Sequence, residues 1–357
     1  MCGIVGYSGP KEPLPILIGG LSRLEYRGYD SAGIAVSDGS DITIEKKEGK
    51  LDVLKEHLAD KKIKGNIGIG HTRWATHGVP NDVNAHPHSD NSEDFAIIHN
   101  GIIENYAEMK DSLLKENYSF KSDTDTEVVA IELSKQWNGN LLETVVKVTK
   151  DLEGTYALVV TTTKQENTIV AGRMMSPLVL GVGEGEVFLA SDSAAILEHT
   201  NKMIFLENGD FVEIHDGKYK LFDADLNDIE REVQIIDWEV SEAEKSGHDH
   251  FMYKEILEQG EVIERTITGR LEEGSPEIPI TKEKAQKYEK IWIVACGTAY
   301  HAGLFGKDLF EKVLGVPVSV ELASEFRYRE PIIGENDLGI VISQSGETMD
   351  TIAATEL

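Results

Sequence analysis

The chain begins Met1-Cys2-Gly3-Ile4-Val5-Gly6-Tyr7, in which a cysteine at position 2 is followed at once by an apolar run. The run from Gly3 to Tyr7 predicts a buried strand that would anchor this end in a core. Removal of the initiator Met would leave Cys2 with a thiol and a free α-amine. Since the ordinary pKa of the amine is about 7.7–8.0 and that of the thiol about 8.5, the amine can accept the thiol proton. The stretch predicts a nucleophile with its own base, and an incidental cysteine at a frayed end is the alternative.

Residues 1–238 alternate short β-rich runs with two amphipathic helices. Leucines recur at helical spacing from Leu14 to Leu24, which predicts the first helix. Thr124 and Glu127 form a capping-box pattern that would open the second helix.

The strands predicted in the same region are short and separated by turn residues. Asn208-Gly209 and Asp216-Gly217 each lie between strand-like runs and predict hairpin turns. Many antiparallel strands with few helices indicate a layered α+β domain. The predicted strands are Ala32–Val36, Ile67–Gly70, Phe95–His99, Tyr156–Thr162, Thr168–Ala171, Val187–Ala190 and Lys202–Leu206.

The pattern changes after an acidic segment. Residues 239–285 are predicted to link two domains and contain a helical stretch that begins near Phe251. Ile291–Ala295 and Leu338–Ile342 are continuous apolar runs, each followed by a polar turn and a helix, which is typical of parallel βα units. Residues 286–357 therefore predict the start of an α/β domain. They are too few to complete a doubly wound sheet, so we expect a truncated domain.

The composition excludes several classes of protein. Lys and Arg total 35 and Asp and Glu total 63 in 357 residues, which gives a formal net charge of −28. This excess repels phosphate backbones and anionic lipid, so we expect neither nucleic-acid nor membrane binding. The only cysteines, Cys2 and Cys296, exclude a disulfide framework and a cysteine-rich zinc site. With no secretory signal pattern at the start, we expect a cytoplasmic protein.

Two polar turns are candidate binding sites. Ser343 to Thr348 lies between a predicted strand and a helix, where backbone N–H groups and hydroxyls favour an anion. It lacks a Walker lysine, so it predicts a phosphate cradle rather than a nucleotide loop, with a simple N-cap as the alternative. In His71 to Gly78, Arg73 could hold a carboxylate through two hydrogen bonds, or could form a surface salt bridge.

Three further groups of residues have two interpretations each. Asn100-Gly101 predicts either an oxyanion hole or a type I′ turn. Asp125 falls in the first turn of its helix, where the helix dipole alone explains an acid. His86-Pro87-His88 and His248-Asp249-His250 lack the spacing of a known metal motif, and we interpret them as turn or surface histidines. No metal or nucleotide is expected.

Together these segments resemble the glutamine–fructose-6-phosphate aminotransferase family. The resemblance implies an α+β N-terminal-nucleophile (Ntn) glutaminase domain, an αββα sandwich, followed by an α/β sugar isomerase (SIS) domain. The matching segments are Cys2–Gly6, Leu24–Gly33, His71–Gly78, His99–Asn105, Thr124–Glu127, Phe251-Met252 with Lys254–Ile256, Thr268–Arg270, Cys296–Thr298, Ser324–Arg329 and Ser343–Thr348.

The resemblance also implies a role for each matching residue. The catalytic residues would be Cys2, which attacks glutamine, with Asn100 and Gly101 on the oxyanion. Glutamine would be bound by Arg73, Thr76, His77 and Asp125. The gate on the ammonia path would be Trp74, and Arg27 would support the site. The sugar phosphate would contact Thr298, Ser343, Gln344, Ser345 and Thr348.

In this family ammonia from L-glutamine passes internally to fructose 6-phosphate and gives glucosamine 6-phosphate, an amino sugar, without a metal or organic cofactor. The resemblance implies a homodimer for the full-length parent. Ala299 stands where the family usually has Ser, which removes one contact near the sugar. Because the second isomerase domain is absent, we expect this fragment to act as a glutaminase only. The alternatives are an amidotransferase of the phosphoribosyl-pyrophosphate or asparagine-synthetase type, and a non-enzymatic sugar-phosphate sensor.

Overall fold

The computed structural model describes residues 2–75, 77–236, 248, 250–268, 271–272, 275–276, 282–344, 346 and 348–357. The chain divides into two compact units, Met1–Phe251 and Met252–Leu357. The division falls within the predicted linker 239–285, at the start of a helix. The outer bounds predicted for the two domains stay predictions.

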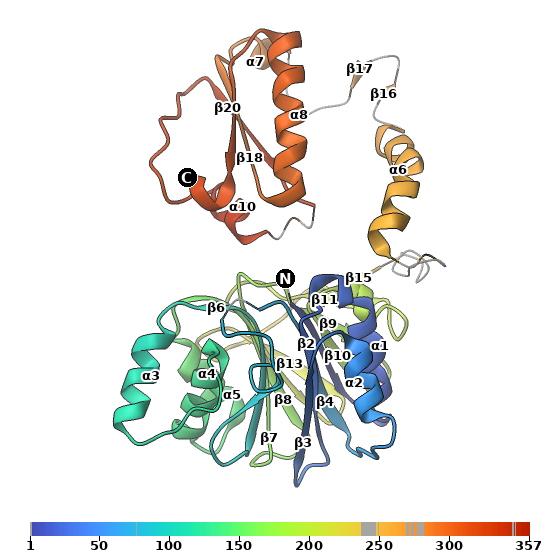
Figure 1. Cartoon of the computed structure of the whole chain (residues 1–357), viewed down its shortest axis with the longest axis vertical. Helices are drawn as coiled ribbons and strands as arrows, with labels where there is room; N and C mark the ends of the chain where they lie inside the picture. Colours follow the sequence, from blue (N-terminus) through green and yellow to red (C-terminus); the bar gives the residue numbers. More distant parts are fainter. Residues whose placement is uncertain are drawn as a thin grey trace. The chain divides into compact units, whose positions relative to one another are not determined.

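Two stacked antiparallel sheets form the centre of the first unit (Figure 1). Among the described residues, the first sheet has eight strands in the order β15-β11-β9-β10-β1-β4-β2-β3, and the second has seven in the order β14-β13-β12-β8-β7-β6-β5. The first consists of β1 Gly3–Ser8, β2 Ser31–Ser37, β3 Ile42–Glu48, β4 Ile67–Arg73, β9 Val179–Val182, β10 Val187–Ala190, β11 Lys202–Phe205 and β15 Gln234–Ile235. The second consists of β5 His88–Ser89, β6 Phe95–Ile103, β7 Gly154–Thr162, β8 Thr168–Met174, β12 Phe211–His215, β13 Lys218–Phe222 and β14 Asp228–Ile229.

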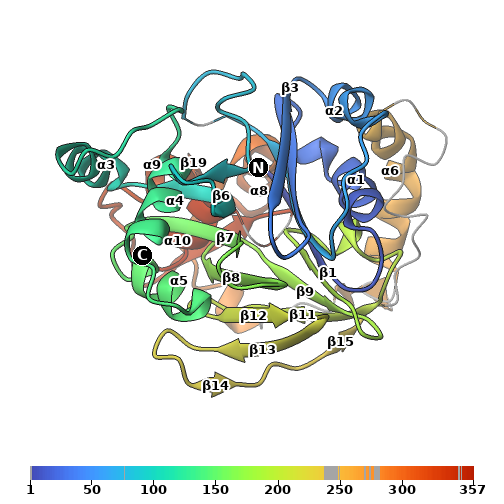
Figure 2. The same ribbon diagram turned by 90° about the horizontal axis from the view of Figure 1, so that it is seen from below.

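Helices cover the outer face of each sheet (Figures 1 and 2). The first sheet carries α1 Pro13–Arg23 and α2 Leu51–Leu58, and the second carries α3 Tyr106–Lys115, α4 Asp125–Lys135 and α5 Leu141–Thr149. Two short 3-10 helices, η1 Glu25–Arg27 and η2 Ser193–Ala195, lie in connections. The layer order helix, sheet, sheet, helix confirms the predicted αββα sandwich.

The alternation of side chains along each strand explains these layers. In β1, Ile4 packs into the core between the two sheets, whereas the next residue, Val5, packs against Leu17 of α1. In β6, Ile98 belongs to the core between the sheets and Ile97 to the core under α4 and α5. Because both faces of the central strands are buried, β1 is apolar except for its terminal Ser8, and β6 is apolar up to Ile98.

One of the two predicted hairpins is confirmed and the other is wrong. Asp216-Gly217 joins β12 to β13, which pair antiparallel, and both residues have positive φ, +47° and +68°. Asn208-Gly209 does not form a hairpin, because β11 and β12 belong to different sheets. The Asn208 side chain instead accepts a hydrogen bond of 2.6 Å from Met175 N, and the loop carries the chain from one sheet to the other.

The second unit has a parallel sheet, as predicted. In its described part β18 lies between β19 and β20, and both pairs are parallel. Strand β19 was not predicted, because it is short and follows a Gly and a Pro. The elements are α6 Phe251–Ile267, β16 Leu271–Glu272, β17 Ser275–Pro276, α7 Lys282–Ala285, β18 Lys290–Ala295, α8 Gly297–Leu314, β19 Val318–Leu322, α9 Ala323–Phe326, β20 Asp337–Ile342 and α10 Met349–Ala353.

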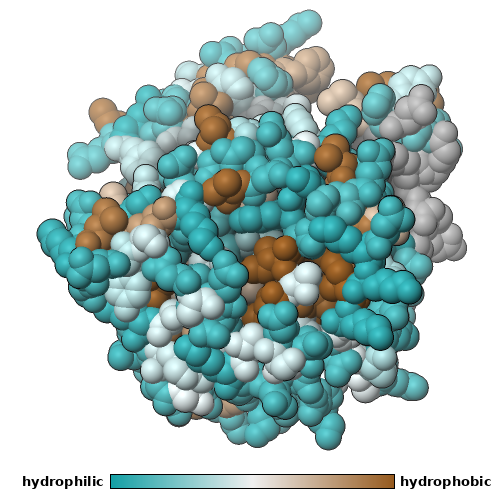
Figure 3. Space-filling view, turned by 60° about the horizontal axis from the view of Figure 1, so that its bottom comes forward, coloured by the Kyte–Doolittle hydropathy of each residue, from teal (hydrophilic) through white to brown (hydrophobic). Residues whose placement is uncertain are grey.

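Hydropathy characterises the surface and the helices beneath it. The face drawn in Figure 3 is mostly hydrophilic, with one hydrophobic recess near its centre. Within the described ranges, no helix combines the length and the apolar character needed to cross a bilayer.

Candidate functional site

Strand β1 places Cys2 beside the end of β4. The register pairs Gly3 with Thr72, so Cys2 lies opposite the residues that follow β4. The Trp74 N–H donates to Cys2 Sγ at 3.2 Å, and Trp74 O lies 3.5 Å from the same sulfur. Burial raises the pKa of the Cys2 thiol, an effect that the Trp74 N–H opposes. The thiol is therefore mostly protonated near neutral pH, and it needs a base to become a nucleophile.

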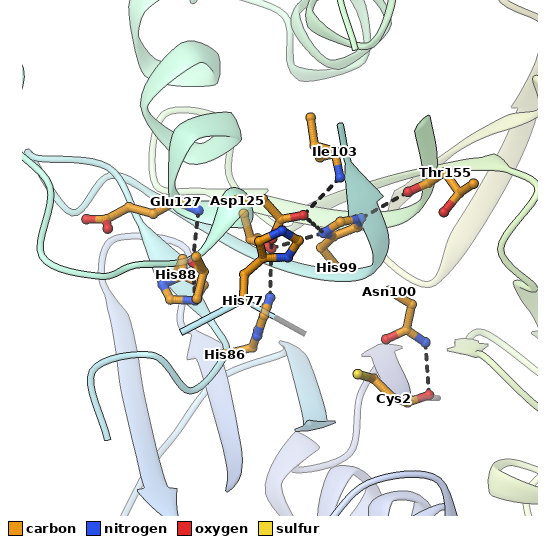
Figure 4. Close-up of polar contacts among 12 residues, drawn as sticks. Cys2, His77, His86, His88, His99, Asn100, Ile103, Asp125, Glu127 and Thr155 are labelled. Atoms are coloured by element: carbon orange, nitrogen blue, oxygen red, sulfur yellow. Dashed lines mark hydrogen bonds and ion pairs between the residues drawn. The ribbon is translucent and has the colours of Figure 1, made fainter. Parts of the chain in front are cut away.

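Asn100 reaches Cys2 from the facing sheet (Figure 4). Its Nδ2 donates to Cys2 O at 3.0 Å, and the residue is buried. Asn100 and Gly101 both lie within β6, paired to β7, so they do not form the type I′ turn that was the alternative. Gly101 has a φ of +135°, and a Cβ there would lie 2.0 Å from Thr155 O. The position accepts only glycine.

Arg73, the last residue of β4, is buried rather than part of a surface salt bridge. Its Nη2 donates to the carbonyls of His77 and Gly78, whereas Nη1 is buried and has no hydrogen-bond partner within the described part of the chain. Burial lowers the pKa of Arg73, while the charges of Asp30 and Asp125 oppose that shift. A buried N–H without an acceptor costs about 1–3 kcal/mol, so this site favours an incoming carboxylate.

Asp125 begins α4 and is buried with its carboxylate against the end of β6 (Figure 4). Its Oδ2 accepts from Ile103 N at 2.9 Å and lies 3.9 Å from His99 Nδ1. Thr124 caps the helix by accepting from Glu127 N, as the sequence pattern predicts. The reciprocal half of the capping box is absent from these contacts, because the Glu127 carboxylate accepts from the N–H groups of residues 121 and 122.

The other residues predicted for this site surround Cys2 less directly. Trp74 is 48% exposed, and its ring meets the Tyr29 ring edge-on at 5.3 Å between centroids. Arg27 is buried and pairs with Asp192 at 2.5 Å. The His77 ring contacts the Tyr106 ring at 5.0 Å. Thr76 lies outside the described residues.

The candidate sugar-phosphate residues lie in the second unit. The parallel register pairs Ala295 with Ile342, so the turns that follow β18 and β20 meet at one edge of the sheet. Thr298 is exposed in the first turn of α8, and Gln344 is exposed after β20. Ser343 Oγ lies 3.2 Å from Thr348 Oγ1 and accepts from Gly346 N. Ser345 lies outside the described residues.

Asp30 has a place in the site that its sequence context does not indicate, although it lies in one of the matching segments. Its Oδ2 accepts from the Ala75 N–H, and its charge acts on both Cys2 and Arg73. Asp30 thus holds the chain segment that carries the Trp74 backbone against the thiol. No local pattern marks this role, because the contact joins residues 45 positions apart.

The interpretation of His86 and His88 as turn or surface residues is wrong. Both are buried: His86 Nε2 lies 2.9 Å from Thr126 Oγ1, and His88 Nε2 lies 3.1 Å from Thr124 Oγ1. They belong to a buried cluster with His71 and His99. In the described ranges, no three or more His, Cys, Asp or Glu side chains are arranged to hold a metal ion.

Comparison with known proteins identifies two families along the chain. The glutamine amidotransferase domain family matches residues 56–234, and the SIS domain family matches residues 285–357. The glutamine–fructose-6-phosphate aminotransferase (isomerizing) of Clostridium acetobutylicum is 49% identical over 99% of this chain and 59% of its own length. That of Caldanaerobacter subterraneus is 51% identical with the same coverage. The chain thus spans about three-fifths of these curated relatives.

A solved structure shows the same fold at lower identity. The glutamine phosphoribosylpyrophosphate amidotransferase of B. subtilis, complexed with ADP and GMP, superposes with a TM-score of 0.57 at 22% identity. The superposition covers 96% of this chain and 69% of that one. At this identity the likeness concerns the fold alone.

Proposed function

The chain belongs to the glutamine amidotransferase domain family, and we infer that its first unit hydrolyses L-glutamine with Cys2 as the nucleophile. The observation that carries this proposal is the convergence on Cys2 of two elements from different sheets. Asn100 of β6 donates a hydrogen bond to the backbone oxygen of Cys2. Arg73 of β4 directly precedes Trp74, whose N–H donates to the Cys2 sulfur. Loss of Met1 would place the α-amine on the same residue as the thiol, where it serves as the base.

In the proposed reaction Cys2 Sγ attacks the side-chain carbonyl carbon of glutamine while the α-amine takes the thiol proton. The negative oxygen of the tetrahedral intermediate accepts hydrogen bonds from Asn100 Nδ2 and the Gly101 N–H. Such a donor is worth about 2.7–4 kcal/mol in the transition state. The C–N bond breaks, the amine proton goes to the leaving ammonia, and water then hydrolyses the thioester to glutamate.

The α-carboxylate and α-ammonium of glutamine need opposite charges. We propose that the free Nη1 of Arg73 binds the carboxylate, with Thr76 and His77 completing that end of the site. Asp125 would bind the ammonium group. The mutual electrostatic influence of Arg73 and Asp125 supports a single site. Trp74, whose backbone contacts the thiol and whose side chain is about half exposed, would gate the escape of ammonia, and Arg27 would support the loop around Cys2.

For the whole protein we propose transfer of the ammonia to fructose 6-phosphate, which gives glucosamine 6-phosphate. Relatives at about 50% identity are glutamine–fructose-6-phosphate aminotransferases, which supports this acceptor. The sugar phosphate would bind at the sheet edge of the second unit, at Thr298, Ser343, Gln344, Ser345 and Thr348, with one hydroxyl fewer because of Ala299. We further propose a cytoplasmic homodimer that needs no cofactor.

The decisive experiment labels the protein with 6-diazo-5-oxo-norleucine and measures intact mass together with glutamate release. We expect loss of Met1, one adduct on Cys2, and no activity in Cys2→Ala. The matched control is Cys296→Ala, which removes the other cysteine and should keep both the adduct and the activity. A retained Met1 with no adduct and no glutamate would contradict the proposal.

The acceptor needs a separate measurement on the whole protein. We expect fructose 6-phosphate to stimulate glutamine turnover more than phosphoribosyl pyrophosphate does. The reverse order would favour an amidotransferase of the phosphoribosyl-pyrophosphate type. Sugar-phosphate binding with no Cys2-dependent turnover would favour a sensor.

A further inference from the structure

His71 lies directly behind Asn100. It is the fifth residue of β4, fully buried, and faces the second sheet. Its Nε2 lies 3.0 Å from Asn100 Oδ1 and 3.1 Å from the backbone oxygen of His99. The function proposed above gives His71 no role.

The chemistry of the partners fixes the position of the proton on this ring. The carbonyl oxygen of Cys2 can only accept a hydrogen bond, so the Asn100 group that faces it at 3.0 Å must be the NH₂ group. The amide oxygen of Asn100 therefore faces His71. Since this oxygen and the His99 carbonyl are both acceptors, His71 Nε2 must carry the hydrogen.

The surroundings keep the His71 ring neutral. Burial lowers the pKa of His71 to about 3. The charges of His99 and Arg73 lower the pKa of His71 as well, whereas its hydrogen bonds to Asn100 and the His99 backbone act in the opposite direction without outweighing burial. The His86 ring stacks on the His71 ring at 4.3 Å between centroids. Nδ1 is buried without a hydrogen-bond partner among the described residues. The ring is thus a fixed donor at one nitrogen.

We propose that His71 is a positioning residue, whose Nε2–H holds the Asn100 amide with its NH₂ group toward Cys2 and the oxyanion. This inference rests on the proposed glutaminase reaction. Without the Nε2–H donor, the amide can rotate and present its oxygen to the developing negative charge. His71 acts only through Asn100, and it transfers no proton, because its donor nitrogen keeps the hydrogen throughout.

A double-mutant cycle tests this dependence. Asn100→Ala should lower kcat for glutamine hydrolysis about 10²–10³-fold, as for loss of one oxyanion donor. His71→Leu should lower kcat roughly 10–100-fold with little change in KM. If His71 acts through Asn100, adding His71→Leu to Asn100→Ala should lower kcat no further. A further loss of similar size in the double variant would overturn the proposal, because it would indicate a merely structural role.

Conservative and remote variants complete the test. His71→Gln keeps an N–H donor near the Nε2 position and should recover most of the activity lost in His71→Leu. The shape of the pH–rate profile should not change in either variant, whereas loss of a limb would identify His71 as an acid or base. His199→Leu, at a ring stacked on Phe188, should keep the wild-type kcat.

A spectroscopic measurement separates this inference from the proposed function. Long-range ¹H–¹⁵N spectra of the wild-type protein should show His71 as the Nε2–H tautomer from pH 8 to pH 5. A Nδ1–H tautomer or an imidazolium signal would overturn the inference even in a fully active enzyme. If the wild-type protein shows this tautomer but releases no glutamate, the proposed function fails, and with it the catalytic purpose assigned to His71.

Discussion

At Gly101 the backbone itself makes the candidate oxyanion site. The positive φ and the approach of Thr155 O leave no room for a side chain. We predict that Gly101→Ala lowers kcat for glutamine hydrolysis at least 100-fold and also lowers Tm, because the N–H must turn away as the backbone relaxes.

The matched control is Gly139→Ala. Gly139 has a φ of +101°, but no atom lies within 4 Å of an added Cβ. This variant should lose about 1–2 kcal/mol of stability from backbone strain alone and keep its kcat. Equal kcat values in the two variants would show that the geometry at Gly101 does not serve the reaction.

Arg73 offers a second test at the residue scale. Because its Nη1 is buried and unpaired in the described part of the chain, we expect the guanidinium to bind the glutamine carboxylate. Arg73→Lys keeps the charge but has a single nitrogen, which cannot replace both Nη2, held by the His77 and Gly78 carbonyls, and Nη1. We predict a rise in KM of about 10–100-fold, equivalent to roughly 1.5–3 kcal/mol, in steady-state kinetics.

Arg231→Ala controls for the loss of a guanidinium elsewhere, since Arg231 pairs with Asp210. It should leave the KM for glutamine unchanged. An unchanged KM in Arg73→Lys would assign the carboxylate to another group.

The sequence predicts only in part which residues come together in the candidate site. Cys2 directly precedes a strand, and Arg73 and Asn100 lie in strands, each within a distinctive motif, so the sequence indicated them, although their roles stay proposals. The positions of Asp30 and His71 could not be inferred, because their contacts join residues 45 and 29 positions apart. The burial of His86 and His88 was missed for the same reason.

At the scale of elements, the N-terminus of α4 connects helix stability to the site. The Thr124 side chain accepts from Glu127 N, and Asp125 follows directly. We predict that Thr124→Ala lowers the free energy of unfolding by about 1 kcal/mol and raises the KM for glutamine, because Asp125 loses its fixed position. Urea unfolding and steady-state kinetics measure the two effects.

Helix α5 supplies the control, since Asn140 caps it by accepting from Glu143 N. Asn140→Ala should cost a similar amount of stability without changing KM. If both variants change KM alike, the cap of α4 has no specific link to the site.

Some elements followed from local sequence patterns, but α2, α3 and α5 were not among the two helices predicted for residues 1–238. Helix α1 follows from its leucine spacing, and the turn at Asp216 from two residues that tolerate positive φ. The sequence cannot show which sheet a strand joins, so Asn208-Gly209 was taken for a hairpin although it connects the two sheets.

At the scale of the whole molecule, the core of the first unit contains four neutral histidines. Burial lowers the pKa of His71 to about 3, and it also lowers the pKa values of His86, His88 and His99. In the unfolded chain each would have a pKa near 6.5. Below about pH 6.5 the unfolded state therefore binds more protons than the folded state. The free energy of unfolding then decreases as the pH is lowered.

We predict that the first unit loses stability steeply between pH 6.5 and pH 5, by roughly 1.4 kcal/mol per pH unit for each histidine that is neutral only when folded. Carboxylates whose pKa is lowered by folding, such as Asp82, contribute at lower pH, since their unfolded pKa is about 4. Urea unfolding followed by pulse proteolysis measures the first unit separately. His88→Gln should reduce the slope of the unfolding free energy against pH by the share of one histidine. His215→Gln, at an exposed side chain, should leave that slope unchanged. A slope that stays flat to pH 5 would mean that the histidine cluster already binds protons in the folded protein.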